Sequence, residues 1–481
     1  MSETGSAQHG TRSTVSVLTL TSMVVGSMVG AGVFSLPQRF AGESGAGGSL
    51  VAWAVAGTGM LMLALVFQRL AVRKPELDAG IYSYAKAGFG EYTGFFAAAG
   101  YWASACTGNV TYWVLIMSTL GQWVPALGAG DTILSIGLSS AGLWLFFLLV
   151  RRGVREATAF NRIVTIAKVI PIIVFVLISI LYFDLDAFIS NGSAADDVGN
   201  LFSQIRGTLL ITVFVFLGVE GASVYSRYAR KREDVGRATI LGFLSVLSIF
   251  ASVTIVSYGI LPRDEIAALQ QPSMAGVLEA AVGPWASIFI SVGLIVAVLG
   301  AYLAWTLMAA EVLFVAAKGK DMPGFLAQQS KTATPVNALL MSTCLAQFIL
   351  IITYVSEDAF DFALNMTAVM VLIPFFLASL YAFQLRRRRE TYENADAWVL
   401  RTDLIITGAA SAYTAFLVLA AGLDLVIFSF IFYAPVTILF AMTRKEQGRR
   451  VFSRGEAAIF AGVVILALLA IAGLATGVID I

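Results

Sequence analysis

The chain has 481 residues, of which 58% are hydrophobic and only 13% are charged. Soluble domains carry roughly 25% charged residues, so this composition excludes an ordinary soluble protein and indicates a polytopic helical membrane protein. The net charge of +1 by itself says nothing about partners, and no nucleic-acid partner is expected. Two cysteines and one histidine, His9 in the polar tail, form no metal-binding or catalytic pattern. We therefore expect neither a metal, nor a cofactor, nor an enzyme.

Apolar runs that are long enough to cross about 30 Å of hydrocarbon recur along the whole chain. Thirteen spans are expected, at residues 14–38, 48–70, 91–123, 132–150, 157–183, 201–226, 237–261, 284–316, 335–355, 359–384, 401–422, 424–443 and 456–478. The polar tail at residues 1–13 shows no cleavage pattern, so the first apolar segment is expected to be retained.

The basic residues predict the orientation of these spans. If the N-terminus is cytoplasmic, 27 of the 31 lysine and arginine residues fall in inner segments. Acidic residues such as Asp184, Asp196 and Glu357 gather in the outer segments instead. The positive-inside rule therefore favours a multi-pass inner-membrane protein with a cytoplasmic N-terminus and, after thirteen spans, an outer C-terminus.

Two of the expected spans carry a pattern that breaks helices. The first contains Gly26, Gly30 and Gly32, which weaken a helix and let its backbone leave the hydrogen-bond ladder. Gly26-x-x-x-Gly30 is also a pattern of close helix packing, so the glycines alone leave both interpretations open. In the sixth span, Gly218 and Gly221 flank Glu220. A carboxylate at bilayer depth costs about 2.5–3.5 kcal/mol on insertion scales, so Glu220 indicates a functional site.

The two breaks lie five spans apart, so the two segments cross the membrane in opposite directions. This predicts an inverted repeat, with one half at 14–183, the other at 201–384 and C-terminal helices at 401–478. Discontinuous helices at matching places in two halves point to the binding site of a transporter. The free N–H groups of a broken helix attract a carboxylate, and its free carbonyls accept from an ammonium. The breaks can thus hold an amino-acid backbone, which leaves Glu220 for another role.

At these residues the chain resembles a known family. The segments 26–34 and 216–223, the latter followed by Arg237-Ala-Thr239, are similar to the first and sixth spans of the amino acid–polyamine–organocation superfamily. Within it, the basic amino acid/polyamine antiporters are most similar, and the segment 310–323 resembles their arginine/ornithine branch. The resemblance covers spans 1 to 12. It implies an all-α, LeuT-like fold with a 5+5 inverted repeat, broken helices 1 and 6, and extra C-terminal helices.

The resemblance also implies roles at the two breaks. Ser27, Ala31 and Gly32 match the part of the first span that meets the substrate carboxylate. Ala31 stands where an arginine/agmatine relative has a serine, so backbone amides would make that contact here. The carbonyls of Phe214 and Leu217 match those that accept from the α-amino group, and the Phe214 ring matches an aromatic gate.

Three more residues match substrate-binding positions of the family. Asn109 would hydrogen-bond the substrate, Tyr101 would form an outer gate, and Trp305 would stack on a guanidinium. Each has an ordinary alternative, because Trp305 and Phe214 could pack or face lipid, Asn109 could join two helices, and Tyr101 could lie in an interfacial belt.

Three charged residues are candidates for coupling or gating. Glu220 is expected to select for a cation or to couple the site to gating. In several sodium-independent relatives a lysine replaces the cation near the position of Lys168, and it would tie the fifth span to carbonyls of the first. Snorkelling to the membrane edge is the alternative for Lys168. Glu311 is either an inner-gate carboxylate or an interfacial residue.

The expected function is therefore secondary transport of small cationic amino acids, with arginine exchanged for ornithine by alternating access and without sodium. The alternatives are a proton-coupled lysine or arginine permease, an arginine/agmatine or ornithine/putrescine exchanger, and a sensor that binds arginine without moving it. The lipid bilayer is the other expected partner. The sequence leaves the oligomeric state open, a homodimer included.

Overall fold

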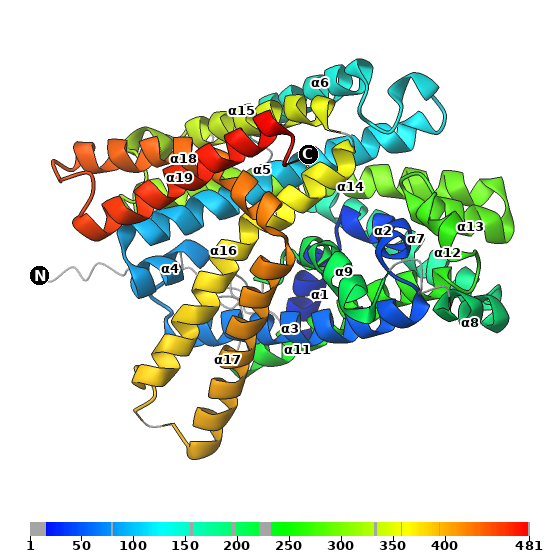
Figure 1. The fold of residues 1–481 in the computed structure, drawn as a ribbon, viewed down its shortest axis with the longest axis horizontal. Coiled ribbons are helices and arrows are strands. Elements are labelled where there is room, and N and C mark those ends of the chain that lie inside the picture. The colour runs from blue at the N-terminus through cyan, green and yellow to red at the C-terminus, as the bar shows by residue number, and fades with distance from the viewer. Residues whose placement is uncertain are drawn as a thin grey trace, which may run out of the picture.

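The computed structural model describes residues 16–77, 80–153, 157–193, 199–220, 232–330, 334–356, 358–393 and 395–479. Over these residues the chain forms helices and no strand (Figure 1). The helices of twelve or more residues are α1 (Val17–Met28), α3 (Ala46–Arg73), α5 (Glu91–Gly121), α6 (Ile133–Arg152), α7 (Ala157–Leu181), α9 (Leu201–Val215), α11 (Arg232–Ser257), α14 (Pro284–Lys318), α15 (Val336–Ile352), α16 (Ala359–Arg388), α17 (Ala397–Ala420), α18 (Leu423–Glu446) and α19 (Arg454–Thr476).

These helices confirm an all-α polytopic membrane protein. In the described part of the chain, nine helices are long and apolar enough to cross a membrane, and two bent pairs raise that number to eleven. The two other predicted spans coincide with α5, which is long but is not among these candidates, and with α9, a shorter apolar helix. The predicted number of thirteen spans therefore stays a prediction.

Helix α5 lies at the centre of the bundle, and nearly every residue from Tyr92 to Thr119 is buried. Small residues on α5 allow neighbouring helices to approach closely. Such close packing drives helix association in membranes, because lipid is as apolar as the side chains. A Cβ on Gly100 would come within 2.8 Å of the carbonyl oxygen of Met370 in α16. In contrast to α5, helix α19 is peripheral, because only 17% of its most apolar stretch is buried.

The first predicted break is present. Helix α1 ends at Met28, and after Val29 and Gly30 the chain continues as the 3₁₀ helix η1 (Ala31–Ser35) and α2 (Leu36–Glu43). The two halves meet at an angle of 54°. A Cβ on Gly26 would meet no described atom within 4 Å, so the described part of the chain shows no close helix packing at Gly26. The structure therefore favours the interpretation of these glycines as a break.

The sixth span is interrupted as well. Helix α9 ends at Val215, and Phe216–Glu220 form a turn beside the first break. The second half of this predicted span, from Gly221 to residue 226, lies outside the described residues. The structure thus shows the half of the sixth span that leads into the break, together with the break itself.

Segments that the sequence left as connections contain four short helices: α4 (Ile81–Phe89), α8 (Leu185–Ser193), α12 (Arg263–Ala267) and α13 (Ser273–Val282). The last two pack on α2. Gln38 donates from its side chain to the carbonyl of Ala267 and from its backbone to Ser273 Oγ, at 3.2 and 3.1 Å. Arg39 pairs with Asp361 at the start of α16. The second half of the first span is therefore held by three neighbouring helices.

Candidate functional site: a pocket between two helix breaks

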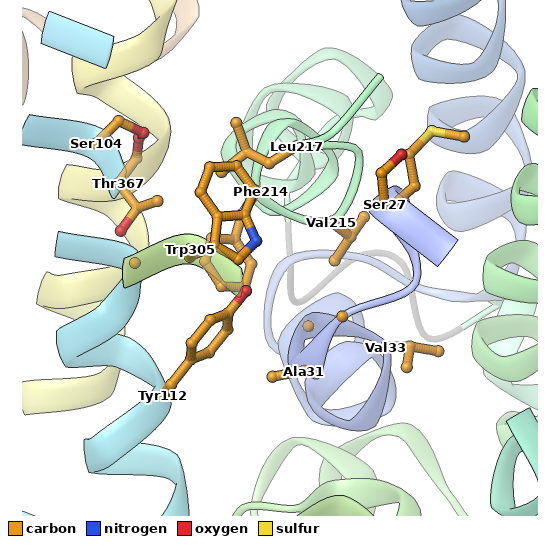
Figure 2. A pocket seen from close by; sticks show the side chains of 14 residues that line it. Ser27, Ala31, Val33, Ser104, Tyr112, Phe214, Val215, Leu217, Trp305 and Thr367 are labelled. Atoms are coloured by element: carbon orange, nitrogen blue, oxygen red, sulfur yellow. The ribbon is translucent and has the colours of Figure 1, made fainter. Parts of the chain in front are cut away.

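A pocket lies where the breaks of the first and sixth spans face α5, α14 and α16 (Figure 2). Six of the nine predicted substrate-binding residues line it: Ser27, Ala31, Gly32, Phe214, Leu217 and Trp305. Its other lining residues are Met28, Gly30, Val33, Ser104, Gly108, Tyr112, Val215 and Thr367. None of these fourteen side chains is charged, so backbone dipoles, hydroxyl groups and aromatic rings provide its polarity.

The first break presents backbone N–H groups to this pocket. Gly30 caps η1 with an extended backbone, and the first residues of a helix have N–H groups with no partner inside that helix. Ala31 and Gly32 line the pocket at the start of η1, so their amides and the helix dipole favour an anion there. Gly32 also permits close contact with the sixth span, because a Cβ there would come within 2.7 Å of Val215 Cγ1.

The sixth break depends on the backbone of Gly218. This residue has a φ angle of +100°, a conformation that L side chains rarely adopt. A Cβ at Gly218 would also overlap the carbonyl oxygen of Ser27. The hydroxyl of Ser27 donates to the carbonyls of Val24 and Gly218, at 2.8 and 3.1 Å. The two breaks are thus in direct contact.

Glu220 lies beside the pocket and is buried. Its Oε1 accepts from the hydroxyl of Tyr101 at 2.6 Å, and its Oε2 accepts from the backbone N–H of Gly218 at 3.1 Å. Neither Glu220 nor Tyr101 is among the lining residues. A short hydrogen bond to a carboxylate is among the stronger ones in proteins, so this pair joins α5 firmly to the sixth break.

Asn109 is the third predicted binding residue that does not line the pocket. Its Nδ2 donates to Thr306 Oγ1 at 3.2 Å, which joins α5 to α14 next to Trp305. Its Oδ1 is buried and has no hydrogen-bond partner in the described part of the chain. The structure therefore shows the helix-joining contact, and the contact between Asn109 and substrate stays a prediction.

Lys168 makes the contact that the sequence predicted for it. Its Nζ donates to the carbonyl oxygen of Gly26 at 2.8 Å, and the side chain is buried. This bond ties the fifth span to the last turn of α1, next to the break. Glu311 is exposed and lines a different pocket, with Val150 and Thr334 among its neighbours. The structure thus brings Lys168 to the first break, outside the pocket lining, and leaves Glu311 apart from both.

Comparison with known proteins identifies the family of this chain. A family model described as amino acid permease matches residues 15–452. The chain belongs to the amino acid permease family. It is 46% identical over 466 residues to an arginine/ornithine antiporter of Pseudomonas aeruginosa, which covers 95% of this chain and 96% of the relative. It is 38% identical to an L-lysine transport protein of Corynebacterium glutamicum, over 97% and 96% of the two chains. It is 35% identical to an arginine/ornithine antiporter of Latilactobacillus sakei, over 95% and 96%.

The permease has three polar pocket residues that the sequence analysis missed: Ser104, Tyr112 and Thr367. Ser104 Oγ donates to the carbonyl of Thr367 at 2.7 Å, which joins α5 to α16 at one side of the pocket. Ser104, Gly108 and Tyr112 recur every four residues, so they share one face of α5. That spacing was the available signal, whereas the prediction had placed Tyr101 and Asn109 on the substrate side of this helix.

Proposed function

We propose that this permease exchanges arginine for ornithine by alternating access. The observation that carries the proposal is the position of the pocket, which lies between two helix breaks in contact with each other. The amides of Ala31 and Gly32 suit an α-carboxylate, and the carbonyls at the end of α9 suit an α-amino group. Arginine and ornithine share both groups, so one set of backbone contacts serves both substrates.

The cationic side chain of the substrate would lie against Trp305. A guanidinium or ammonium over a tryptophan face gains roughly 0.5–2 kcal/mol, the larger value where water is excluded. Because the lining residues carry no charge, the pocket holds the same net charge whichever of the two monovalent cations occupies it. One-for-one exchange is then electroneutral and requires no coupling ion.

The environment of Lys168 supports transport without sodium. Its ammonium donates a hydrogen bond to the carbonyl of Gly26. A sodium ion near the first break would need oxygen ligands of this kind. A fixed ammonium supplies one positive charge at this position in every state of the cycle. We therefore propose that Lys168 replaces a coupling cation.

The predicted orientation places the Tyr101–Glu220 pair on the cytoplasmic side of the pocket. Along α5, Tyr101 precedes the lining residues Ser104, Gly108 and Tyr112, and the third span runs outward if the N-terminus is cytoplasmic. Along the sixth span, Glu220 follows the lining residue Leu217 toward the inner side. We therefore propose an inner gate at this pair, in place of the outer gate that the resemblance implied for Tyr101. The cytoplasmic N-terminus, the outer C-terminus and the inner-membrane location are part of the same proposal.

Counterflow in proteoliposomes tests this function. Vesicles loaded with ornithine should take up labelled arginine rapidly, whereas empty vesicles and vesicles loaded with agmatine should take up little. Replacing sodium by potassium on both sides should leave the rate unchanged. Binding of arginine without any counterflow would favour a sensor over a transporter.

A proton-coupled lysine or arginine permease is the second candidate. The identity of 38% to a protein named as an L-lysine transport protein concerns lysine as a substrate and does not bear on proton coupling. This candidate predicts that a pH gradient drives uptake of labelled lysine into empty vesicles. Such uptake, at a rate comparable with counterflow, would contradict the exchanger.

A further inference from the structure

The pocket contains a hydroxyl that neither the resemblance nor the fold accounts for. Tyr112 projects from α5 into the pocket, and its hydroxyl points toward the side chains of Trp305 and Phe214, which also line it (Figure 2). The residue is 94% buried, since its exposed fraction is 6%. Its hydroxyl makes no hydrogen bond within the described part of the chain, whereas the Ser104 and Thr367 hydroxyls, also in this pocket, donate to backbone carbonyls. The Tyr112 oxygen faces the pocket and is not among the fully buried atoms without a partner, so a group in the pocket can bond to it.

The hydroxyl of Tyr112 lies next to the first break. Its oxygen is 3.5 Å from the position that a Cβ on Gly30 would occupy. Gly30 is the cap of η1, so the hydroxyl and the amides of Ala31 and Gly32 lie around the same small space. Because η1 continues directly into α2, the helix behind these amides runs from Ala31 to Glu43, and its dipole favours an anion there.

The need for such a hydroxyl follows from Ala31. This residue offers its backbone N–H to the pocket but has no side-chain donor. A carboxylate has two oxygens and about four acceptor positions, more than two backbone amides can fill. Gly30 has no side chain to block the approach of a third donor from α5, and the hydroxyl of Tyr112 is 3.5 Å from the place that such a side chain would take.

We propose that the hydroxyl of Tyr112 donates a hydrogen bond to the α-carboxylate of the substrate and so makes the permease selective for amino acids over the decarboxylated amines. This inference rests on the proposed function and adds a specificity-determining residue to it. Arginine and ornithine both present the carboxylate that Tyr112 would bind. Agmatine and putrescine have no such group, so they leave the hydroxyl and both amides without an acceptor.

The test compares wild type with Tyr112→Phe, which removes one oxygen and keeps the ring. Inhibition of labelled arginine exchange is measured for two kinds of competitor. Arginine and ornithine carry an α-carboxylate, whereas agmatine and arginine methyl ester do not. The inhibition constants of arginine and ornithine should rise about tenfold or more in the variant, the size expected for a lost hydrogen bond to a charged group. Those of the two compounds without a carboxylate should change by less than about twofold. Equal changes for both kinds of compound, or no change for either, would overturn the inference.

A matched control and a second variant complete the test. Tyr92→Phe removes another buried hydroxyl of α5, one that bonds Thr437 and does not line the pocket, and should leave every inhibition constant unchanged. Adding Ala31→Ser to Tyr112→Phe supplies a new hydroxyl at the break and should restore part of the affinity for arginine. A double variant no better than Tyr112→Phe would count against a carboxylate contact. Wild-type protein without arginine binding or exchange would defeat the proposed function itself, whereas an active wild type with an unaffected Tyr112→Phe defeats only this inference.

Discussion

The two helix breaks are held in place by different means. The sixth break is built from its own residues, because Gly218 adopts a positive φ angle and Glu220 accepts from the N–H of Gly218. The first break is held by other parts of the chain. Lys168 of α7 binds the carbonyl of Gly26, and Gln38 and Arg39 fix the following half-helix to its neighbours. The first break is therefore sensitive to movement of the fifth span, whereas the sixth depends on its own backbone in addition to its bonds with Tyr101 and Ser27.

This difference suggests that the two breaks have different roles, one in substrate recognition and the other in gating. The first break offers amides to the carboxylate that all amino acids share, and the lysine that holds it is a fixed charge. The sixth break carries the only acidic side chain among the predicted binding residues, and that carboxylate is bonded to Tyr101 across the site. Recognition of the backbone and response of the gate are thus located at opposite breaks.

The largest effect is expected from Glu220→Gln, which removes the charge of the sixth break and keeps its shape. The maximal rate of arginine exchange should fall by at least about tenfold, because the bond to Tyr101 loses its charged acceptor. Exchange in proteoliposomes measures this, with Glu279→Gln on the exposed face of α13 as a control that should be neutral. A near-normal rate would remove Glu220 from the mechanism and contradict the different roles of the two breaks.

The second-largest effect is expected from an alanine at Gly218 in the sixth break, compared with an alanine at Gly26 beside the first break. Gly218→Ala introduces a Cβ at a positive φ angle and against the backbone of Ser27, so it should destabilise the protein by about 2–3 kcal/mol or more and reduce exchange. Gly26→Ala, in the last turns of α1, meets open space and should be tolerated. Thermal unfolding in detergent and exchange rates measure both variants. Equal sensitivity at the two glycines would contradict the comparison.

Lys168→Ala tests the support of the first break. Loss of the ammonium leaves the carbonyl of Gly26 without its buried partner, a change that costs about 1–3 kcal/mol. Because this bond joins two spans and does not touch the pocket, the maximal rate should fall by about tenfold while the KM for arginine changes by less than about threefold. Lys445→Ala, at the exposed end of α18, is the matched control. An unchanged rate would make Lys168 a simple anchor.

The smallest effect is expected at Trp305, which belongs to neither break. Trp305→Leu should raise the KM for arginine by about 2- to 30-fold, the range that corresponds to one cation–π contact. Trp285→Leu removes an exposed tryptophan from the same helix, α14, and should leave KM unchanged. If both variants behave alike, Trp305 is a packing residue.

Part of this arrangement could be predicted from the sequence because charges are rare inside apolar helices and clustered glycines weaken a helix. Gly218 and Glu220 marked the sixth break, and Lys168 marked the tie to the first span. The short helices α4 and α13 were not predicted, because they lie in connections between spans and contain no apolar run long enough to indicate a helix.

The hydroxyl groups of the pocket could not be chosen in advance. Thr111 and Thr119 of α5 donate to carbonyls four residues earlier in their own helix, as hydroxyls in membrane helices commonly do. Among the tyrosines of α5, Tyr92 bonds Thr437, Tyr101 bonds Glu220 and Tyr112 lines the pocket. Which of them faces the breaks depends on the rotation of α5, which is set by packing against α14 and α16. Side-chain chemistry alone therefore could not separate Tyr112 from its neighbours.

The stoichiometry of exchange tests the central claim most directly. Labelled arginine entering and ornithine leaving are measured together in proteoliposomes whose membrane potential is clamped at zero, negative and positive values. One pocket that accepts either cation predicts one ornithine released for each arginine taken up, at a rate that does not depend on potential, pH gradient or sodium. Arginine accumulation that exceeds ornithine release and follows the potential or the pH gradient would contradict it.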